Sequence, residues 1–263
     1  MRPLYVLGIW AVAVPLVAGC GDSTGPGELD FEWSGQIAQG DQLEIKGING
    51  NIEVTLAAGS TAEVRAYKRA DRNDPDSVTV EVVEYAGGIT VCAVYPDVPG
   101  QPANECLPGD QGNMTVQDND VEVNFTVLLP AGVVLVGETI NGAVTADGLL
   151  SNAFVSTING DARVTTTQLA RASTVNGSVT AAVGLITWDR DLTFSTVNGN
   201  VEVEVPDATN AEVRLTTANG SVSSEFTEVV QVAPGDWRGT LGSGGRQLAV
   251  ASVNGNVGLL RGP

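Results

Sequence analysis

Short runs of alternating apolar and polar residues cover much of the chain and predict many short β-strands. Clear examples are the apolar positions that alternate through residues 78–82, 89–93 and 121–129. Such strands bury one face and leave the other polar, so the pattern predicts an all-β protein with one long hydrophobic core.

A second pattern joins these strands, because the dipeptide Asn-Gly recurs with similar neighbours. The copies are Asn49-Gly50, Asn141-Gly142, Asn159-Gly160, Asn176-Gly177, Asn198-Gly199, Asn219-Gly220 and Asn254-Gly255. Apolar residues stand six, four and one positions before nearly every Asn, and three positions after it. A straight strand would put the positions four and one before Asn on opposite faces, so we expect a bend that keeps both inward. Gly and Asn tolerate positive φ and predict a second bend, so the repeat reads as strand, corner, short inward step, corner, strand.

The spacing of the copies suits one coil of a solenoid, since successive gaps of 18, 17, 22 and 21 residues follow Asn141. The last gap of 35 residues predicts a coil with an excursion near residues 234–245. A hydroxyl residue precedes six of the Asn residues by two positions, and we expect these to stack as a hydroxyl ladder beside an Asn ladder: Thr139, Thr157, Thr174, Thr196, Thr217 and Ser252.

Asn-Gly between apolar strands is also the strongest hairpin signal, and that reading gives a meander, sandwich or propeller. It does not explain the neighbours that recur with Asn-Gly. We therefore predict a single-stranded, right-handed parallel β-helix (β-solenoid) with Asn-Gly corner repeats and about ten coils. The Trp33 segment and Leu259-Leu260 are the expected caps of its ends.

The first residues read as an export signal, with Arg2 before an apolar stretch from Leu4 to Ala18. The end of this stretch, Leu16-Val17-Ala18-Gly19-Cys20, resembles the lipobox of bacterial lipoproteins. We expect a lipoprotein signal peptide at 1–19, a lipidated Cys20 with a flexible tether at 20–30, and the solenoid at 31–263. The protein is then lipid-anchored in the bacterial cell envelope. Gly21, rather than Asp, after the cysteine favours the outer membrane if the cell has one.

Cys92 and Cys106 flank a loop rich in Pro and Gly. Outside the cytoplasm, such a pair predicts one disulfide, and two cysteines alone supply too few ligands for a metal site.

The charge balance excludes several classes of function. The formal net charge is −18 and there is no His. Serine triads, papain-like sites and histidine-ligated zinc are therefore excluded, and a nucleic acid would meet a repulsive field. We expect no cofactor and no metal site.

From Leu43 to Leu260 the chain resembles the bacterial "putative adhesin" family of unknown function, related to head-GIN domain adhesins. The resemblance rests on the segments 43–52, 127–132 and 241–245 together with the Asn-Gly series. It implies a β-helix fold and an envelope location, and it implies no catalytic residues. The loop between the two cysteines is a departure from this pattern.

Three groups of residues suggest local chemistry. Trp188-Asp189-Arg190-Asp191 is the candidate ligand-binding loop, since a tryptophan beside charged groups can stack on a sugar and hydrogen-bond it. The alternative is a Trp lid with a local ion pair. The acidic loops 71–76 and 118–120 carry oxygen ligands, but the first lacks the glycine and glutamate of an EF-hand, so solvated loops are favoured over calcium. A polysaccharide enzyme using Asp189 and Asp191 lacks support, because neighbours in sequence rarely reach the required separation.

The expected function is that of a non-catalytic, membrane-anchored adhesin or binding module whose partner is a glycan or an envelope protein. The alternatives are an architectural or envelope-sensing module that binds another envelope protein and, third, a polysaccharide-active β-helix enzyme.

Overall fold

The computed structural model describes residues 29–262, and almost every element in this range is a β-strand. The first half comprises β1 (Leu29–Gln36), β2 (Gln42–Lys46), β3 (Ile52–Leu56), β4 (Thr61–Arg69), a 3-10 helix (Pro75–Ser77), β5 (Thr79–Tyr85), β6 (Gly88–Val94), β7 (Glu122–Leu129), β8 (Val134–Glu138), β9 (Val144–Leu149) and β10 (Ala153–Ser156). The second half comprises β11 (Ala162–Thr166), β12 (Ala170–Ser173), β13 (Val179–Val183), β14 (Leu192–Asn198), β15 (Val201–Pro206), β16 (Ala211–Asn219), β17 (Val222–Ser224), β18 (Val230–Ala233), β19 (Asp236–Leu241), β20 (Gln247–Asn254) and β21 (Val257–Gly262). The all-β prediction is confirmed. Strand β1 begins two residues before the expected start of the solenoid at 31.

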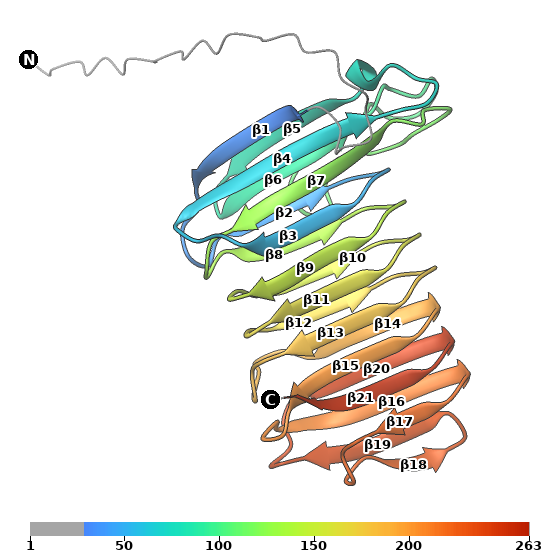
Figure 1. Cartoon of the computed structure of the whole chain (residues 1–263). Coiled ribbons are helices and arrows are strands. Elements are labelled where there is room, and N and C mark those ends of the chain that lie inside the picture. Colours follow the sequence, from blue (N-terminus) through green and yellow to red (C-terminus); the bar gives the residue numbers. More distant parts are fainter. Residues whose placement is uncertain (1–28, 263) are drawn as a thin grey trace, which may run out of the picture.

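The strands form two sheets, one of ten and one of eleven strands. Within each sheet the strands follow one another along a common axis, as Figure 1 shows. Each coil contributes one strand to the eleven-stranded sheet and, after a corner, one strand to the ten-stranded sheet. Neighbouring coils pair in parallel, as between β10 and β12 and between β11 and β13. Among the described residues eight such coils stack, fewer than the expected ten, because antiparallel strands replace coils at both ends.

The coils do not stack in sequence order. The β2/β3 coil lies between the β6/β7 and β8/β9 coils, and the β20/β21 coil lies between the β14/β15 and β16/β17 coils. The long last gap between Asn-Gly copies is therefore an excursion through β18 and β19, after which the chain returns to insert a coil one place back.

Antiparallel strands close both ends of the stack. At one end β1 and β4 extend the ten-stranded sheet and β5 extends the eleven-stranded sheet, and at the other end β19 and β18 pair beyond β16. Trp33 lies in the edge strand β1, as expected for a cap. The expectation for Leu259-Leu260 is wrong, because β21 is inserted between β15 and β17, and Leu259 pairs with both strands.

The core corrects one step of the sequence interpretation. Residues six, four and two positions before Asn point inward, since Ala153, Val155 and Thr157 are all buried in β10 and just after it. The residue one position before Asn is exposed at most corners, among them that of Ile158 at 43%, whereas at the first corner Ile48 is only 1% exposed. No extra bend is needed, because a buried Thr takes the third inward position and regular alternation continues to the corner.

The predicted signal peptide, the lipidated Cys20 and most of the tether lie outside the described residues. Within 29–262, no helix is long and apolar enough to cross a membrane.

Candidate functional site

The Asn-Gly steps lie where the chain passes from the eleven-stranded to the ten-stranded sheet, and their side chains form one ladder. Each Nδ2 donates over 2.8 Å to the Oδ1 of the preceding rung, in the spatial order Asn49, Asn141, Asn159, Asn176, Asn198, Asn254 and Asn219. The glycines are required by the close approach of the coils. A Cβ on Gly160 would overlap the carbonyl oxygen of Gly142, and equivalent overlaps recur along the column.

The predicted hydroxyl ladder is wrong in its partners. Each hydroxyl donates to a corner glycine carbonyl of the neighbouring coil: Thr139 to Gly50 at 3.1 Å, Thr157 to Gly142 at 2.8 Å, Thr174 to Gly160 at 2.8 Å, Thr196 to Gly177 at 2.8 Å, Thr217 to Gly255 at 2.7 Å and Ser252 to Gly199 at 2.9 Å. These carbonyls point toward the buried hydroxyls, and a buried acceptor is costly to leave unpaired. The corner side chains are thus occupied in holding coils together.

The predicted disulfide is confirmed, with the Cα atoms of Cys92 and Cys106 5.7 Å apart. Cys92 lies in β6 between the core residues Val91 and Ala93, so strand alternation directs it to the outer face of the eleven-stranded sheet. The bond therefore ties the loop between the cysteines onto that face.

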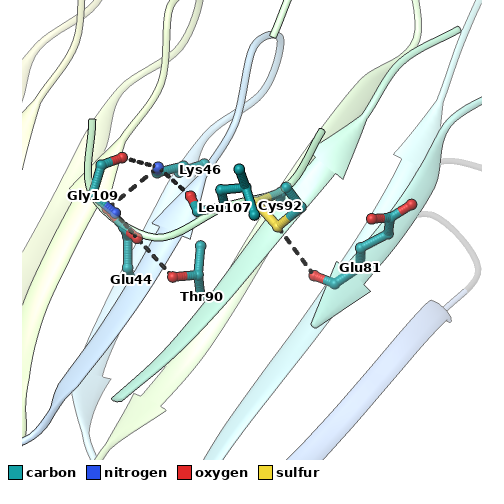
Figure 2. The surroundings of a disulfide bond; sticks show 8 residues. Glu44, Lys46, Glu81, Thr90, Cys92, Leu107 and Gly109 are labelled. Carbon is teal, nitrogen blue, oxygen red and sulfur yellow. Dashed lines mark hydrogen bonds and ion pairs between the residues drawn. A yellow bond between two sulfur atoms is a disulfide. The ribbon is translucent and has the colours of Figure 1, made fainter. Parts of the chain in front are cut away.

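The segment after Cys106 covers a small polar network, which Figure 2 shows beside the disulfide. Lys46 Nζ donates to the carbonyls of Leu107, at 2.7 Å, and Gly109. Glu44 Oε2 accepts from Gly109 N at 3.0 Å and from Thr90 Oγ1 at 2.7 Å. Glu44 is only 2% exposed and lies 3.6 Å from Lys46, so the loop buries a paired charge.

Glu138 borders this network, because β8 pairs with β2 and aligns Glu138 with Lys46. Burial raises the pKa of Glu138, and the negative charges of Glu44 and Asp110 raise it further, while Lys46 acts in the opposite direction. A carboxyl group whose proton affinity is increased thus lies at the edge of the covering loop.

Beyond the loop, the outer face of β8, β10, β12, β14, β20 and β16 is open, and we call it the platform. In-register pairing aligns its side chains in three columns along the axis. The first holds Val136, Phe154, Arg171, Thr193, Ala249 and Arg214; the second Glu138, Ser156, Ser173, Ser195, Ala251 and Thr216; the third Ile140, Ile158, Val175, Val197, Val253 and Ala218. Ile158, Val175, Val197 and Val253 are 38–44% exposed. The platform thus presents apolar, hydroxyl and charged groups at strand spacing, about 4.8 Å.

A groove of about 370 Å³ runs across the platform, and the side chains that line it from the exposed face are Glu138, Phe154, Ser156, Arg171, Ser173, Thr193 and Ser195. Within residues 29–262, no hydrogen bond engages the three serine hydroxyls or the hydroxyl of Thr193. They are therefore available to a ligand. Phe154 supplies an aromatic face beside them.

The predicted binding loop borders this groove. The Arg171 guanidinium donates to the Asp191 carbonyl from Nε at 3.2 Å and from Nη2 at 2.6 Å. Trp188 is partly buried against the core, and its Nε1 is buried without a hydrogen-bond partner in the described part of the chain. Asp189 and Arg190 form an exposed pair at 3.3 Å. The loop thus holds Arg171 in place, and Trp188 packs against the core and is not among the residues that line the groove.

The two acidic loops bind each other. Asp120 accepts from the backbone N of Asn73 at 2.9 Å and from the backbone N and the Nε of Arg72 at 3.1 and 3.2 Å. These hydrogen bonds, that of Asn73 foremost, lower the pKa of Asp120. In the range 29–262, no group of three or more acidic or cysteine side chains is arranged to hold a metal ion.

A second hollow of about 500 Å³ lies on the opposite sheet and includes Tyr67 and Arg69. Some of its polar groups are paired, since Arg69 bonds Glu122 at 2.9 Å and Asn124 Oδ1 accepts from the backbone of Asn51 at 2.9 Å. The platform groove offers more free hydrogen-bonding groups.

Sequence reasoning missed the groove because it followed the apolar, inward positions of the repeat. The signal was present in the outward positions: Ser156, Ser173 and Ser195 stand three residues before their Asn in consecutive copies.

Comparison with known proteins identifies one family and several solved structures of low sequence identity. The model of the family described as Toastrack DUF4097 matches residues 34–260. The solved structure of a putative cell adhesion protein from Clostridium sporogenes is similar over 89% of this chain and 100% of its own, with 8% identity and a TM-score of 0.47. That of a putative adhesin from Bacteroides fragilis is similar over 89% and 99%, with 11% identity and a TM-score of 0.34. No curated protein matches the chain.

Proposed function

The chain belongs to the Toastrack DUF4097 family, and from this premise we propose that it is a non-catalytic binding module of the bacterial cell envelope. A lipid on Cys20 holds it on a membrane, and the platform faces the ligand. The solenoid is right-handed, as connections between parallel strands of one sheet almost always are.

The observation that carries this proposal is the groove on the platform. An extended ligand lying along the solenoid axis meets the free hydroxyls of Ser156, Ser173 and Ser195 in succession, with Phe154 and Arg171 beside them. Repeated side chains at equal spacing suit a repeating polymer, and surface carboxylates disfavour a polyanion.

We take the ligand to be a neutral glycan. Sugar rings have an apolar face that stacks on an aromatic ring and a rim of hydroxyls that hydrogen-bond serine, threonine and arginine. The groove holds both kinds of group within one 370 Å³ space. The Trp188–Asp191 loop contributes by orienting Arg171 through the Asp191 carbonyl.

The test is glycan binding by the soluble domain, residues 28 to 263, measured on an array of neutral and acidic envelope polysaccharides and by calorimetry. Phe154→Ala should weaken binding about tenfold or more, because an aromatic stack and its buried area are lost. Tyr67→Ala, on the opposite sheet, is the matched control and should bind normally. Equal loss in both variants, or no binding to any neutral glycan, would contradict the proposal.

Absence of catalysis is tested on the same glycans. We expect no release of reducing ends after prolonged incubation, because no pair of carboxylates faces the groove from opposite sides: of its lining residues only Glu138 is acidic. Release that disappears in Glu138→Gln would instead favour an enzyme.

A second candidate function rests on the exposed aliphatic column. Val175 and Val197 lie on one ridge of the platform at 38% exposure each, and such a row suits the apolar surface of another envelope protein. Cross-linking in intact cells that is lost in Val175→Ser with Val197→Ser, but kept in Phe154→Ala, would favour this architectural or sensing role over the glycan.

The membrane anchor is tested separately. Cys20→Ala should abolish incorporation of labelled fatty acid. Undiminished labelling of the variant would contradict the lipid anchor and leave the platform proposal unaffected.

A further inference from the structure

We infer that Asn219-Gly220 is a site of spontaneous covalent modification, the step of the Asn-Gly series at which the folded protein deamidates first. The inference is independent of the proposed function. It rests on where the hydrogen-bonded ladder ends.

The chemistry is a general liability of Asn-Gly, whose asparagine is among the thermolabile residues. The backbone nitrogen of the glycine attacks Cγ of the asparagine, a C–N bond forms, and Nδ2 leaves as ammonia with the proton that the glycine nitrogen gives up. Water then opens the cyclic imide at either carbonyl and yields aspartate or isoaspartate. The net change is uptake of one water and loss of one ammonia, without oxidation or reduction. Glycine permits the attack because it has no Cβ to block it.

Six of the seven steps are protected at both reacting groups. The glycine N–H donates to an asparagine carbonyl of the next coil at 2.8–3.0 Å, so the nucleophile is engaged in a backbone hydrogen bond. The donors are Gly50, Gly142, Gly160, Gly177, Gly199 and Gly255. The side-chain Oδ1 of each of the same six asparagines accepts an Nδ2 at 2.8 Å. Both the attacking nitrogen and the amide under attack are thereby fixed.

The last rung lacks both restraints. Gly255 donates to the carbonyl of Asn219, but no described residue accepts from the N–H of Gly220 or donates to Oδ1 of Asn219. The only ladder bond of the Asn219 side chain is its own donation to Asn254 at 2.8 Å. Both residues of the step are exposed, so water can reach them.

The other end of the ladder differs. Gly50 N donates to the carbonyl of Asn141 at 2.8 Å, and Nδ2 of Asn49 approaches the carbonyls of Asn119 and Val121 at 3.4 Å. The segment before β7 therefore covers Asn49, whereas within residues 29–262 no coil lies beyond the rung at Asn219. The asymmetry of the two ends singles out one step.

The modification changes the C-terminal end of the stack. Aspartate at 219 sets a carboxylate against Oδ1 of Asn254 in place of the donor, and isoaspartate also lengthens the backbone that presents the carbonyl to Gly255. Either product weakens the attachment of β16 to β20 and adds negative charge to an acidic protein.

The experiment incubates the folded soluble domain at mildly alkaline pH and follows each Asn-Gly peptide by mass spectrometry. Asn219 should deamidate about tenfold faster than the interior rungs, since two hydrogen bonds of ordinary strength protect each of those. The same chain in concentrated urea is the matched control, and there the seven rates should converge. An interior asparagine that reacts as fast as Asn219 in the folded chain would overturn the inference.

A variant moves the exposed end by one rung. Asn219→Ala removes the donor to Oδ1 of Asn254 but keeps the backbone bond from Gly255, so Asn254 should react faster than in the parent protein and more slowly than Asn219 does there. An unchanged rate at Asn254 would show that the side-chain ladder gives no protection and would overturn that part of the inference. Circular dichroism confirms that the variant is folded.

Discussion

The buried hydroxyls at the corners allow the sharpest test of what holds the coils together. Thr174 lies in a central coil, is 5% exposed and donates to the Gly160 carbonyl at 2.8 Å. Its alternative acceptor, the carbonyl of Ile158, is 3.5 Å away and already accepts from Asn176 N at 2.7 Å. Among the described residues no other donor reaches the Gly160 oxygen, so the hydroxyl is its sole partner.

Thr174→Val keeps the shape of the side chain and removes only the donor. Because a buried carbonyl then loses its partner, the free energy of unfolding should fall by about 1–3 kcal/mol. For a chain of this size that corresponds to a thermal midpoint lower by about 2–12 °C. Thr174→Ser keeps the donor and loses one methyl group, at a cost of about 0.8 kcal/mol. Ser252 already fills the equivalent position and bonds Gly199 at 2.9 Å, so serine fits this geometry.

The assay is equilibrium unfolding in urea, monitored by circular dichroism. A midpoint shift is interpreted only where the variants share the same m, the slope of the unfolding free energy against urea concentration. The combined change of Thr157, Thr174 and Thr196 to Val should cost about three times the single change, and the combined change to Ser clearly less. If valine is tolerated as well as or better than serine at these positions, the hydroxyl–carbonyl bonds do not stabilise the stack.

Three further outcomes are expected. The pKa of Glu138 is raised in the folded state, so this carboxyl group favours folding most at acid pH, and its contribution to stability is lost as the pH rises through the raised pKa. Glu138→Gln should therefore raise the urea midpoint at neutral pH, and this gain should vanish below the pKa of an ordinary glutamate. Replacing Cys92 and Cys106 by Ala should lower the free energy of unfolding by about 3 kcal/mol for a loop of this length, and an unchanged thermal midpoint would contradict a stabilising role of the disulfide. Gly177→Ala should prevent native stacking or lower the midpoint far more than a surface change, because its Cβ would overlap the Gly160 carbonyl; a native-like melt would show that the coils can separate locally.

The strands and the repeat were predictable because they depend on local pattern. Alternation of apolar residues and the seven Asn-Gly steps predicted an all-β parallel repeat, and the parallel ladders confirm it. The family assigned by resemblance is confirmed by the family match, and the disulfide by its geometry. The inward direction assigned to Ile158, Val175, Val197 and Val253 was wrong, although their equivalent Ile48 is buried. Hydrophobicity alone does not reveal that a buried Thr157 can satisfy its hydroxyl on a neighbouring coil.

The site was less accessible to sequence reasoning. Trp188 was chosen for its chemistry, yet its ring packs partly against the core, while the groove is lined by Phe154 and by serines at outward positions of the repeat, which the sequence interpretation did not use. Such a groove depends on which outward side chains stand side by side, and that is a property of register between coils.

By itself the sequence determined the strands and the Asn-Gly corners, because these follow from periodicity and from glycine's lack of a Cβ over a few residues. It also determined the disulfide, because only two cysteines remain beside Cys20 and they flank one loop. Only the tertiary structure decided the order of the coils, with β2/β3 and β20/β21 inserted out of sequence, and therefore which residues face each other on the platform. The physical reason is that every coil offers nearly the same hydrogen-bonding edge and apolar face. The repeat pattern therefore permits more than one order of stacking, and the order is a property of the assembled stack.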